Sequence, residues 1–277
     1  MKRLIALITD FGYKDPYVGV MKAVIKSINP DVDIIDLTHG ITRHDVLEAA
    51  LTLAISAKYF QRGTIFVVVV DPGVGSTRRA LLIETSNYIL IGPDNGCLTL
   101  LAEADRVKRV FDISNTRYRL GEMSSTFHGR DLFAPVAAWV SKDVPLEEIG
   151  VEIDYAIVNK IKIEKPSVKD DELRGMVVLI DVYGNIMTNI DKQLLNELNI
   201  AYDTPLAIKT YRSEDICIFE RSFSMVPKGA LACYINSWGF LEIGENMGDA
   251  ARRLMVEKGE EIVIRRQPLN KNARTNR

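Results

Sequence analysis

The sequence predicts an α/β N-terminal domain with a mostly parallel sheet flanked by helices, followed by a smaller, barrel-like all-β C-terminal domain. Three observations predict this. Apolar runs alternate with amphipathic helical stretches in the first half of the chain. Residues 64–70 (TIFVVVV) are apolar at every position, which is typical of a strand covered on both faces. Beyond residue 174 the pattern changes to short β runs separated by Gly, Asn and Pro.

The N-terminal elements follow from hydrophobic spacing and from stop signals. A first strand over residues 3–9 breaks at Asp10-Phe11-Gly12, and a helix over 16–28 is stopped by Asn29-Pro30. Further strands are predicted at 34–38, 64–70, 80–84, 88–91 and 109–113, and further helices at 45–59, 97–104 and 131–141.

A polar, proline-containing stretch over residues 159–174 marks the boundary between the domains. We therefore assign residues 1–165 to the α/β domain and 172–266 to the β domain. Residues 267–277 are basic and lack periodicity, which favours a flexible, solvated tail over a nucleic-acid-binding arm. Strands of the β domain are predicted at 175–181, 186–190, 205–210, 216–219, 230–235 and 239–243.

Composition excludes several classes of partner. The 277 residues include 35 Lys and Arg against 37 Asp and Glu, a balance that argues against nucleic acid. No apolar run approaches the roughly 18 residues that a membrane span needs. The basic and apolar start resembles a signal peptide but lacks a small-residue cleavage site, so it is interpreted as a strand. Three cysteines without CxxC spacing predict neither a disulfide framework nor a thiolate metal site, and favour a reducing cytoplasm.

An aspartate lies at or just after four of the predicted strands. Each taken alone can be a turn former or a helix cap. Because ligands of open α/β sheets bind beyond the carboxyl ends of the strands, four at one edge favour a ligand site. These residues are Asp10, Asp36, Asp71 and Asp94.

The histidines and the other motifs leave three kinds of ligand open. His128 precedes Gly129 in a predicted loop and suits a functional imidazole, whereas Asp131 suits a helix cap; His39 and His44 have weaker cases. A phosphate cradle lacks the Walker lysine. A metal site could use Asp10, Asp71, Asp94 and His128, but no HxxxH or DxD spacing supports it, so no metal is expected. An organic ligand with a ribose diol suits an aspartate.

The predicted β domain has two polar turns of its own. Residues 181–185 (DVYGN) form a plausible hairpin turn between two strands, and 236–239 (NSWG) form a second turn that contains Trp238. A tryptophan in a turn either packs against the core or stacks on a flat heterocycle.

These motifs, in this order, resemble the S-adenosylmethionine hydrolase family (S-adenosylmethionine hydroxide adenosyltransferases), which is related to the fluorinase and chlorinase. The resemblance spans nearly the whole chain and implies hydrolysis of S-adenosyl-L-methionine to adenosine and L-methionine, with no cofactor. It also implies a homotrimer with substrate sites between subunits. The matching segments are TDFGYKDPYVGVMK, DLTHGI, VVVVDPGVGSTRR, GPDNG, STFHGRDLFAP, DVYGNIMTNI and NSWGFLEIGENMG.

The resemblance also implies roles for individual residues. The family's catalytic Asp-Arg-His set falls on Asp71, Arg78 and His128, and its ribose-binding aspartate falls on Asp10. Its contacts to the methionine end of the substrate fall on Asp15, Tyr17, Asp181 and Ser237. Its adenine contacts fall on Asn185 and on the neighbourhood of Trp238 and Met247.

The halogenating branch of the family departs at the position of Asp71, where it uses a tyrosine, and the fluorinase carries an inserted loop. This chain has the aspartate and no long insertion between Asp45 and Cys97, so halide transfer is disfavoured. Three alternatives remain: a 5′-halogenase, a non-catalytic adenosine- or S-adenosylmethionine-binding protein, and a metal phosphoesterase.

Overall fold

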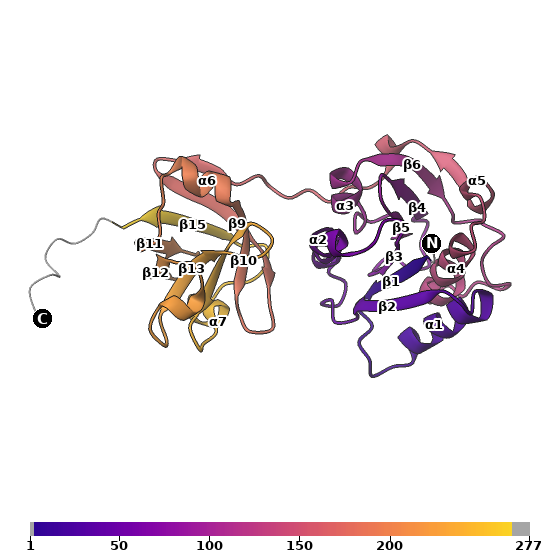
Figure 1. Cartoon of the computed structure of the whole chain (residues 1–277), viewed down its shortest axis with the longest axis horizontal. Helices are drawn as coiled ribbons and strands as arrows, with labels where there is room; N and C mark the ends of the chain where they lie inside the picture. The colour runs from indigo at the N-terminus through magenta and orange to yellow at the C-terminus, as the bar shows by residue number, and fades with distance from the viewer. Residues whose placement is uncertain (1–2, 268–277) are drawn as a thin grey trace, which may run out of the picture. The chain divides into compact units, whose positions relative to one another are not determined.

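Within residues 3–267, which the computed structural model describes, seven strands form one sheet in the order β2-β1-β3-β5-β4-β6-β7. Strands β2, β1, β3 and β5 are parallel, and β4, β6 and β7 extend the sheet in antiparallel fashion. The chain divides between residues 162 and 163 into two units, and this sheet belongs to the first (Figure 1). Its strands are β1 (Leu4–Thr9), β2 (Asp33–Thr38), β3 (Ile65–Val69), β4 (Ala80–Thr85), β5 (Ile89–Pro93), β6 (Val107–Asp112) and β7 (Val151–Ile153).

Helices cover both faces of this sheet, as the all-apolar run over residues 64–70 predicts. Ile65, Val67 and Val69 of β3 belong to the apolar core shared with helices α1 (Tyr17–Ile28) and α4 (Ala134–Ser141). The alternate residues, Phe66 and Val68, belong to the core on the other face, which α2 (Val46–Ser56) and α3 (Thr99–Ala104) cover. Every residue of β3 is buried because successive side chains point to opposite, covered faces. The predicted α/β class is confirmed.

The helix predicted over residues 131–141 begins differently. A π-helical turn, Gly129–Phe133, precedes α4, and the short helix α5 (Leu146–Ile149) follows. Asp131 lies inside the π turn and does not cap α4. Its side chain, which is 2% exposed, instead accepts a hydrogen bond from the backbone N–H of Ser124 and pairs with Arg130.

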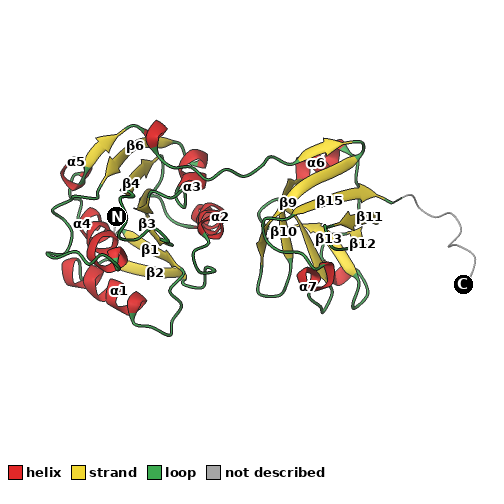
Figure 2. Ribbon diagram, turned by 180° about the vertical axis from the view of Figure 1, so that it is seen from behind, coloured by secondary structure: helices red, strands yellow, loops and turns green. Residues whose placement is uncertain are grey.

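The second unit is a closed barrel of seven strands, in agreement with the predicted barrel-like β domain (Figure 2). All neighbouring strands are antiparallel except β12 and β13, which are parallel. A short outer strand, β8 (Ser167–Lys169), pairs with β9. The barrel strands are β9 (Glu172–Ile180), β10 (Ile186–Asp191), β11 (Thr204–Lys209), β12 (Glu214–Phe219), β13 (Leu231–Ile235), β14 (Phe240–Glu245) and β15 (Glu261–Arg266).

Two helices of the barrel unit were not predicted, because the analysis of this half searched for β runs. Helix α6 (Lys192–Glu197) begins at Asp191, whose carboxylate caps two backbone N–H groups. Helix α7 (Ala250–Leu254) begins at Asp249, which caps the N–H of Arg252. Of the predicted tail, residues 268–277 lie outside the described residues. No helix formed by residues 3–267 is long and apolar enough to span a membrane.

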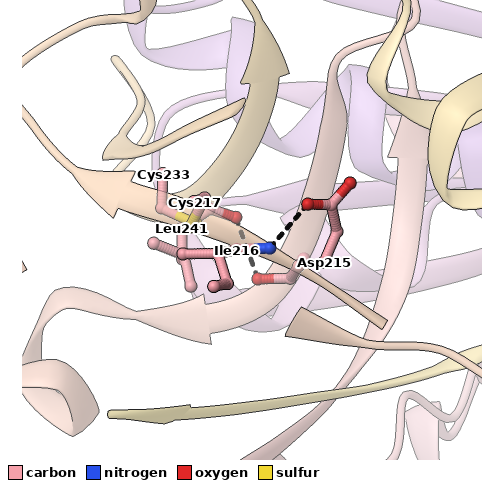
Figure 3. The surroundings of a disulfide bond; sticks show 6 residues. Asp215, Ile216, Cys217, Cys233 and Leu241 are labelled. Atoms are coloured by element: carbon pink, nitrogen blue, oxygen red, sulfur yellow. Dashed lines mark hydrogen bonds between the residues drawn. A yellow bond between two sulfur atoms is a disulfide. The ribbon is translucent and has the colours of Figure 1, made fainter. Parts of the chain in front are cut away.

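The expectation of no disulfide is wrong. Cys217 of β12 and Cys233 of β13 form a disulfide, with their Cα atoms 5.8 Å apart and both side chains fully buried beside Leu241 (Figure 3). An odd number of cysteines does not reveal which strands become neighbours. Here barrel closure makes β12 and β13 adjacent, in a register that pairs Cys217 with Leu231. Cys97 is free and buried.

Removing this disulfide should destabilise the protein. The sequence separation is 16 residues, and a loop of this length corresponds to about 3 kcal/mol of unfolding free energy. We expect a Cys217→Ala/Cys233→Ala variant to unfold at lower urea concentration by that amount. As a control, a reductant should shift the midpoint of the wild type and leave the double variant unchanged. An unshifted wild type whose thiols titrate as reduced would contradict the expectation.

Candidate active site

The segments that follow β1, β2 and β3, together with the start of the π-helical turn, line a cavity of about 310 Å³. The loop after β1 contributes Asp10 and Asp15, α1 contributes its first residue, Tyr17, the loop after β3 contributes Asp71, and the start of the π-helical turn contributes His128. The structure therefore brings together these five predicted site residues, which are up to 118 positions apart in the sequence (128 − 10). Among its other lining residues are Arg43, His44 and Val74.

Arg78 binds Asp71, which lines the cavity, through two charge-assisted contacts. Its Nε donates to Asp71 Oδ1 at 2.7 Å, and its Nη2 donates to Asp71 Oδ2, so that the guanidinium holds both carboxylate oxygens. The side chains are only 10% (Arg78) and 5% (Asp71) exposed. A buried ion pair persists when both partners are hydrogen-bonded in this way.

The same guanidinium determines the state of His128. Arg78 Nη2 lies 2.9 Å from His128 Nδ1, and because arginine only donates, we assign Nδ1 as the acceptor. The ring proton of the neutral imidazole is then on Nε2. Burial, together with the positive charge of Arg78, lowers the pKa of His128 below its ordinary value. The cavity thus contains a carboxylate acceptor and an imidazole N–H donor fixed by one cation.

An aromatic cluster forms one wall of the cavity. The rings of Phe11, Tyr17 and Phe127 contact one another in edge-to-face or tilted geometry, with centroids 5.0–5.8 Å apart. The sequence analysis did not identify Phe11, although it lies next to Asp10. Aromatic faces attract cations, most strongly where water is excluded. This wall therefore suits a ligand that is both apolar and positively charged.

Asp10 is held by backbone rather than by a cation. One oxygen, Oδ2, accepts a hydrogen bond from the backbone N–H of His44 at 2.9 Å. His44 has a positive φ of 65° and is exposed beside the cavity, which aims its N–H at the carboxylate. The other oxygen, Oδ1, has no partner among residues 3–267, which leaves it able to accept from a ligand hydroxyl.

Asp94 and Asp36, both considered as members of the polar edge, do not line this cavity. The Asp94 carboxylate is 1% exposed and accepts from Arg79 Nε at 2.8 Å and from the backbone N–H of Asn159. It thereby fastens residues 157–159 to the end of β5. Among residues 3–267 there is no group of three or more His, Cys, Asp or Glu with the spacing to hold a metal ion.

The remaining predicted site residues line a second cavity, of about 860 Å³, in the barrel unit. Asp181 accepts from the N–H groups of Tyr183 and Asn185, and from the Asn185 amide, which stabilises the turn between β9 and β10. Trp238 lines the cavity, so it is available for stacking. The predicted residues on this cavity are Asp181, Asn185, Ser237, Trp238 and Met247.

The sequence analysis missed a hydrogen-bonded group on this second cavity. Glu242 accepts from the Tyr234 hydroxyl at 2.6 Å and from the Asn236 amide at 2.9 Å. Asn236 Oδ1 in turn accepts from the N–H groups of Trp238 and Phe240. Burial, and then the bond to Glu242, raise the pKa of Tyr234, which keeps its hydroxyl a donor. In the sequence, this group is signalled by Glu242, a charged residue between the apolar Leu241 and Ile243 of β14.

Comparison with known proteins shows which family the chain matches. The models "SAM hydroxide adenosyltransferase N-terminal domain" and "SAM hydroxide adenosyltransferase C-terminal domain" match residues 5–150 and 175–263. The chain is 38% identical to the (R)-S-adenosyl-L-methionine hydrolase of Methanocaldococcus jannaschii, over 94% of this chain and 95% of the relative. An uncharacterized conserved protein from Thermotoga maritima of known structure is 39% identical, with a TM-score of 0.89, over 95% of this chain and 100% of that one.

A fluorinase of Actinoplanes sp. is more distant, at 28% identity over 94% of this chain and 97% of the fluorinase. The alignment with the fluorinase spans 293 positions, against 271 with the hydrolase of M. jannaschii, for the same share of this chain. The fluorinase therefore carries insertions that this chain lacks.

The contact with Arg78 makes a prediction about His128. We expect NMR to find His128 as the Nε2–H tautomer with a pKa below about 6.5, since protonation would place N–H on the atom that faces Arg78. An Arg78→Met variant should raise that pKa, because a positive charge is removed while Asp71 stays. The His128→Gln spectrum identifies the resonance. A pKa that is unchanged or lower in Arg78→Met would contradict the assignment.

Proposed function

The chain belongs to the SAM hydroxide adenosyltransferase family, and from this premise we propose that it hydrolyses S-adenosyl-L-methionine to adenosine and L-methionine. The hydrolase relatives are named for the (R) form of that compound, and we propose the same form here. The observation that carries the proposal is the Asp71–Arg78–His128 cluster at a cavity with an aromatic wall.

The chemistry of the substrate suits this cavity. The sulfonium carries a positive charge, which the rings of Phe11, Tyr17 and Phe127 attract. Displacement at C5′ breaks the C5′–S bond, and the electron pair leaves with sulfur as a neutral thioether. No acid is needed to protonate the leaving group and no metal is needed to hold it. We accordingly propose a reaction without a cofactor.

The barrier lies with the incoming water, which is a weak nucleophile. Holding water in line with the C5′–S bond offsets about 7–11 kcal/mol in favourable systems. Removing its proton during attack contributes roughly 10²–10⁴-fold. Asp71 is the acceptor for that proton, and Arg78 holds its carboxylate in place through two hydrogen bonds. His128, as the Nε2–H tautomer, donates to the water oxygen and orients it.

The other residues bind the substrate in this proposal. The free oxygen of Asp10 accepts from the ribose hydroxyls, and Asp15 and Tyr17 contact the methionine end together with Asp181 and Ser237. Asn185, Trp238 and Met247 surround the adenine. The apolar and aromatic lining of the second cavity, with amide and carboxylate groups at its margin, supports the binding of a flat heterocycle there. We propose a cytoplasmic location, because the substrate is a metabolite of the cell interior.

The products test the proposal directly. In ¹⁸O-labelled water, we expect S-adenosyl-L-methionine to yield methionine and adenosine labelled at its 5′-hydroxyl, because water attacks C5′. Added chloride or fluoride should leave the products unchanged. A 5′-halo nucleoside would establish a halogenase, tight binding without methionine release would establish a binding protein, and loss of activity with EDTA would favour a metal phosphoesterase.

Substitutions of the cluster should separate chemistry from binding. We expect Asp71→Asn and His128→Ala to lower kcat by at least about 10²-fold with a small change in KM, because each removes a group that acts on the water. In the wild type, kcat should fall as the pH falls through the lowered pKa of His128. Glu84→Gln, in an ion pair on the same sheet, is the control. Near wild-type turnover in both cluster variants would exclude these roles.

We also propose that the active unit is a homotrimer, in which the barrel cavity of one subunit completes the Asp71–His128 cavity of the next. The division of the site residues between two units supports this. Large apolar side chains are exposed near both cavities, among them Tyr13 (70% exposed), Tyr183 (75%) and Met247 (80%). Exposed apolar groups of this size favour burial in an interface.

Complementation tests the shared site. When His128→Ala and Trp238→Ala chains are co-expressed and purified through both of their different tags, only mixed trimers remain, and they should show about a third of wild-type activity, since one of the three sites in each mixed trimer combines two intact halves. Each variant alone should be nearly inactive. If the mixed assembly is as inactive as the single variants, the site does not lie between subunits.

A further inference from the structure

The proposed reaction makes no use of a buried histidine beside the cavity. His39 follows β2 and is 1% exposed. It lies next to Thr9, the last residue of β1, which is fully buried as well. His39 Nδ1 lies 2.8 Å from Thr9 Oγ1. Thr9 immediately precedes Asp10, so this pair is one residue away from the carboxylate that faces the cavity.

The loop that carries Asp10 is attached to the loop after β2 at several points. The N–H of Gly12 donates to the carbonyl of His39 at 2.7 Å, and the N–H of Phe11 donates to Thr9 Oγ1 at 3.2 Å. In the other direction, the N–H of Ile41 donates to the carbonyl of Thr9. Gly12 has a φ of +65°, which allows the chain to turn back after Phe11. The two loops therefore form one hydrogen-bonded body around Asp10.

Asp36 completes the arrangement from the far side of His39. Asp36 Oδ1 lies 3.2 Å from His39 Nε2, which is an ion-pair distance, and neither atom has a hydrogen-bond partner among the described residues. Asp36 Oδ2 accepts from Lys22 of α1 at 2.6 Å and from the Tyr13 hydroxyl at 3.3 Å. The Tyr13 ring also packs edge-on against the imidazole, with centroids 5.1 Å apart. Both the loop and the helix that follows it are thus tied to one carboxylate.

The charge of the Asp36 carboxylate favours its contact with the His39 ring at neutral pH. Burial by itself would raise the pKa of the Asp36 carboxyl, but its contacts with Lys22 and His39 lower it below its ordinary value. Asp36 is therefore ionised at neutral pH, and because its Oδ1 lies at ion-pair distance from Nε2, we assign the ring N–H of His39 to Nε2. With this tautomer Nδ1 accepts from the Thr9 hydroxyl, and the Thr9 oxygen remains free to accept from the N–H of Phe11.

We propose that Thr9, His39 and Asp36 form a clamp whose role is to hold the Asp10 carboxylate in position for the substrate's ribose. These are positioning residues: none of them lines the cavity. The proposal rests on the proposed function, because that function gives Asp10 its ligand. A carboxylate fixed before binding loses less freedom on binding, so the clamp acts on substrate affinity more than on the attack of water.

Isosteric substitution of Thr9 tests the clamp with little change of packing. We expect Thr9→Val to raise KM for S-adenosyl-L-methionine by about tenfold and to change kcat much less, since the Asp71–Arg78–His128 cluster comes from other loops. Thr9→Ser, which retains the hydroxyl, should restore most of the affinity. In an Asp10→Ala background, Thr9→Val should cause no further rise in KM, whereas a merely structural role would give additive effects.

Substitution of His39 adds a second matched pair. The amide of His39→Asn reaches the place of Nδ1 and can still bond Thr9, whereas that of His39→Gln reaches toward Asp36. We expect the His39→Asn variant to retain more affinity for S-adenosyl-L-methionine than the His39→Gln variant. Asp105→Asn is the control for stability: Asp105 holds Thr85 and Asn87 in a comparable network at the opposite end of the same sheet. It should lower the melting temperature and leave KM unchanged.

Hydrogen exchange distinguishes failure of the clamp from failure of the proposed function. In Thr9→Val, the amides of Phe11, Gly12 and His44 should exchange at least about tenfold faster than in the wild type, while those of β3 stay protected. If the wild type releases no adenosine, the proposed function is wrong and exchange alone decides the clamp. Unchanged exchange at these amides, or an equal rise in KM with and without Asp10, would overturn the proposal.

Discussion

The Arg78 guanidinium is the interaction on which the site depends. It faces Asp71 through two donors and His128 through a third contact, and all three side chains are largely buried. Without this cation, the Asp71 carboxylate would lose both donors and no contact would assign His128 Nδ1 as an acceptor. With it, the carboxylate is an acceptor and the imidazole is a neutral donor. The arrangement is rigid because arginine, unlike lysine, presents several donors in one plane.

The parallel half of the sheet explains why these residues meet. Strands β1, β2 and β3 all run in one direction, so the loops after them emerge at the same edge. Because β3 is buried on both faces, the end of the strand that leads to Asp71 is held in place. The loops after β1 and β2 are joined by hydrogen bonds on either side of Asp10. The π-helical turn before α4 then brings His128 to Arg78. Side chains far apart in the sequence thus share a rigid support.

Local sequence patterns were sufficient to locate the strands that carry the site. They were insufficient to predict which side chains pair with one another. The all-apolar run of β3 and the Asp-Gly signals after β1 are local properties of the chain, and they located both correctly. Asp94 follows β5 in the same kind of polar turn, yet it is bound to Arg79 and does not line the cavity. Which carboxylate meets a cation depends on packing between distant segments. The same reason explains the unexpected disulfide, which exists because barrel closure places β12 beside β13.

By itself, the sequence determined the fold class, because hydrophobic period and turn chemistry are written in neighbouring residues, and it predicted the candidate site residues. Only the tertiary structure decided which of those residues meet and in what protonation state. Burial and charge at a point depend on every segment packed around it, and for His128 they come from Arg78, 50 positions away.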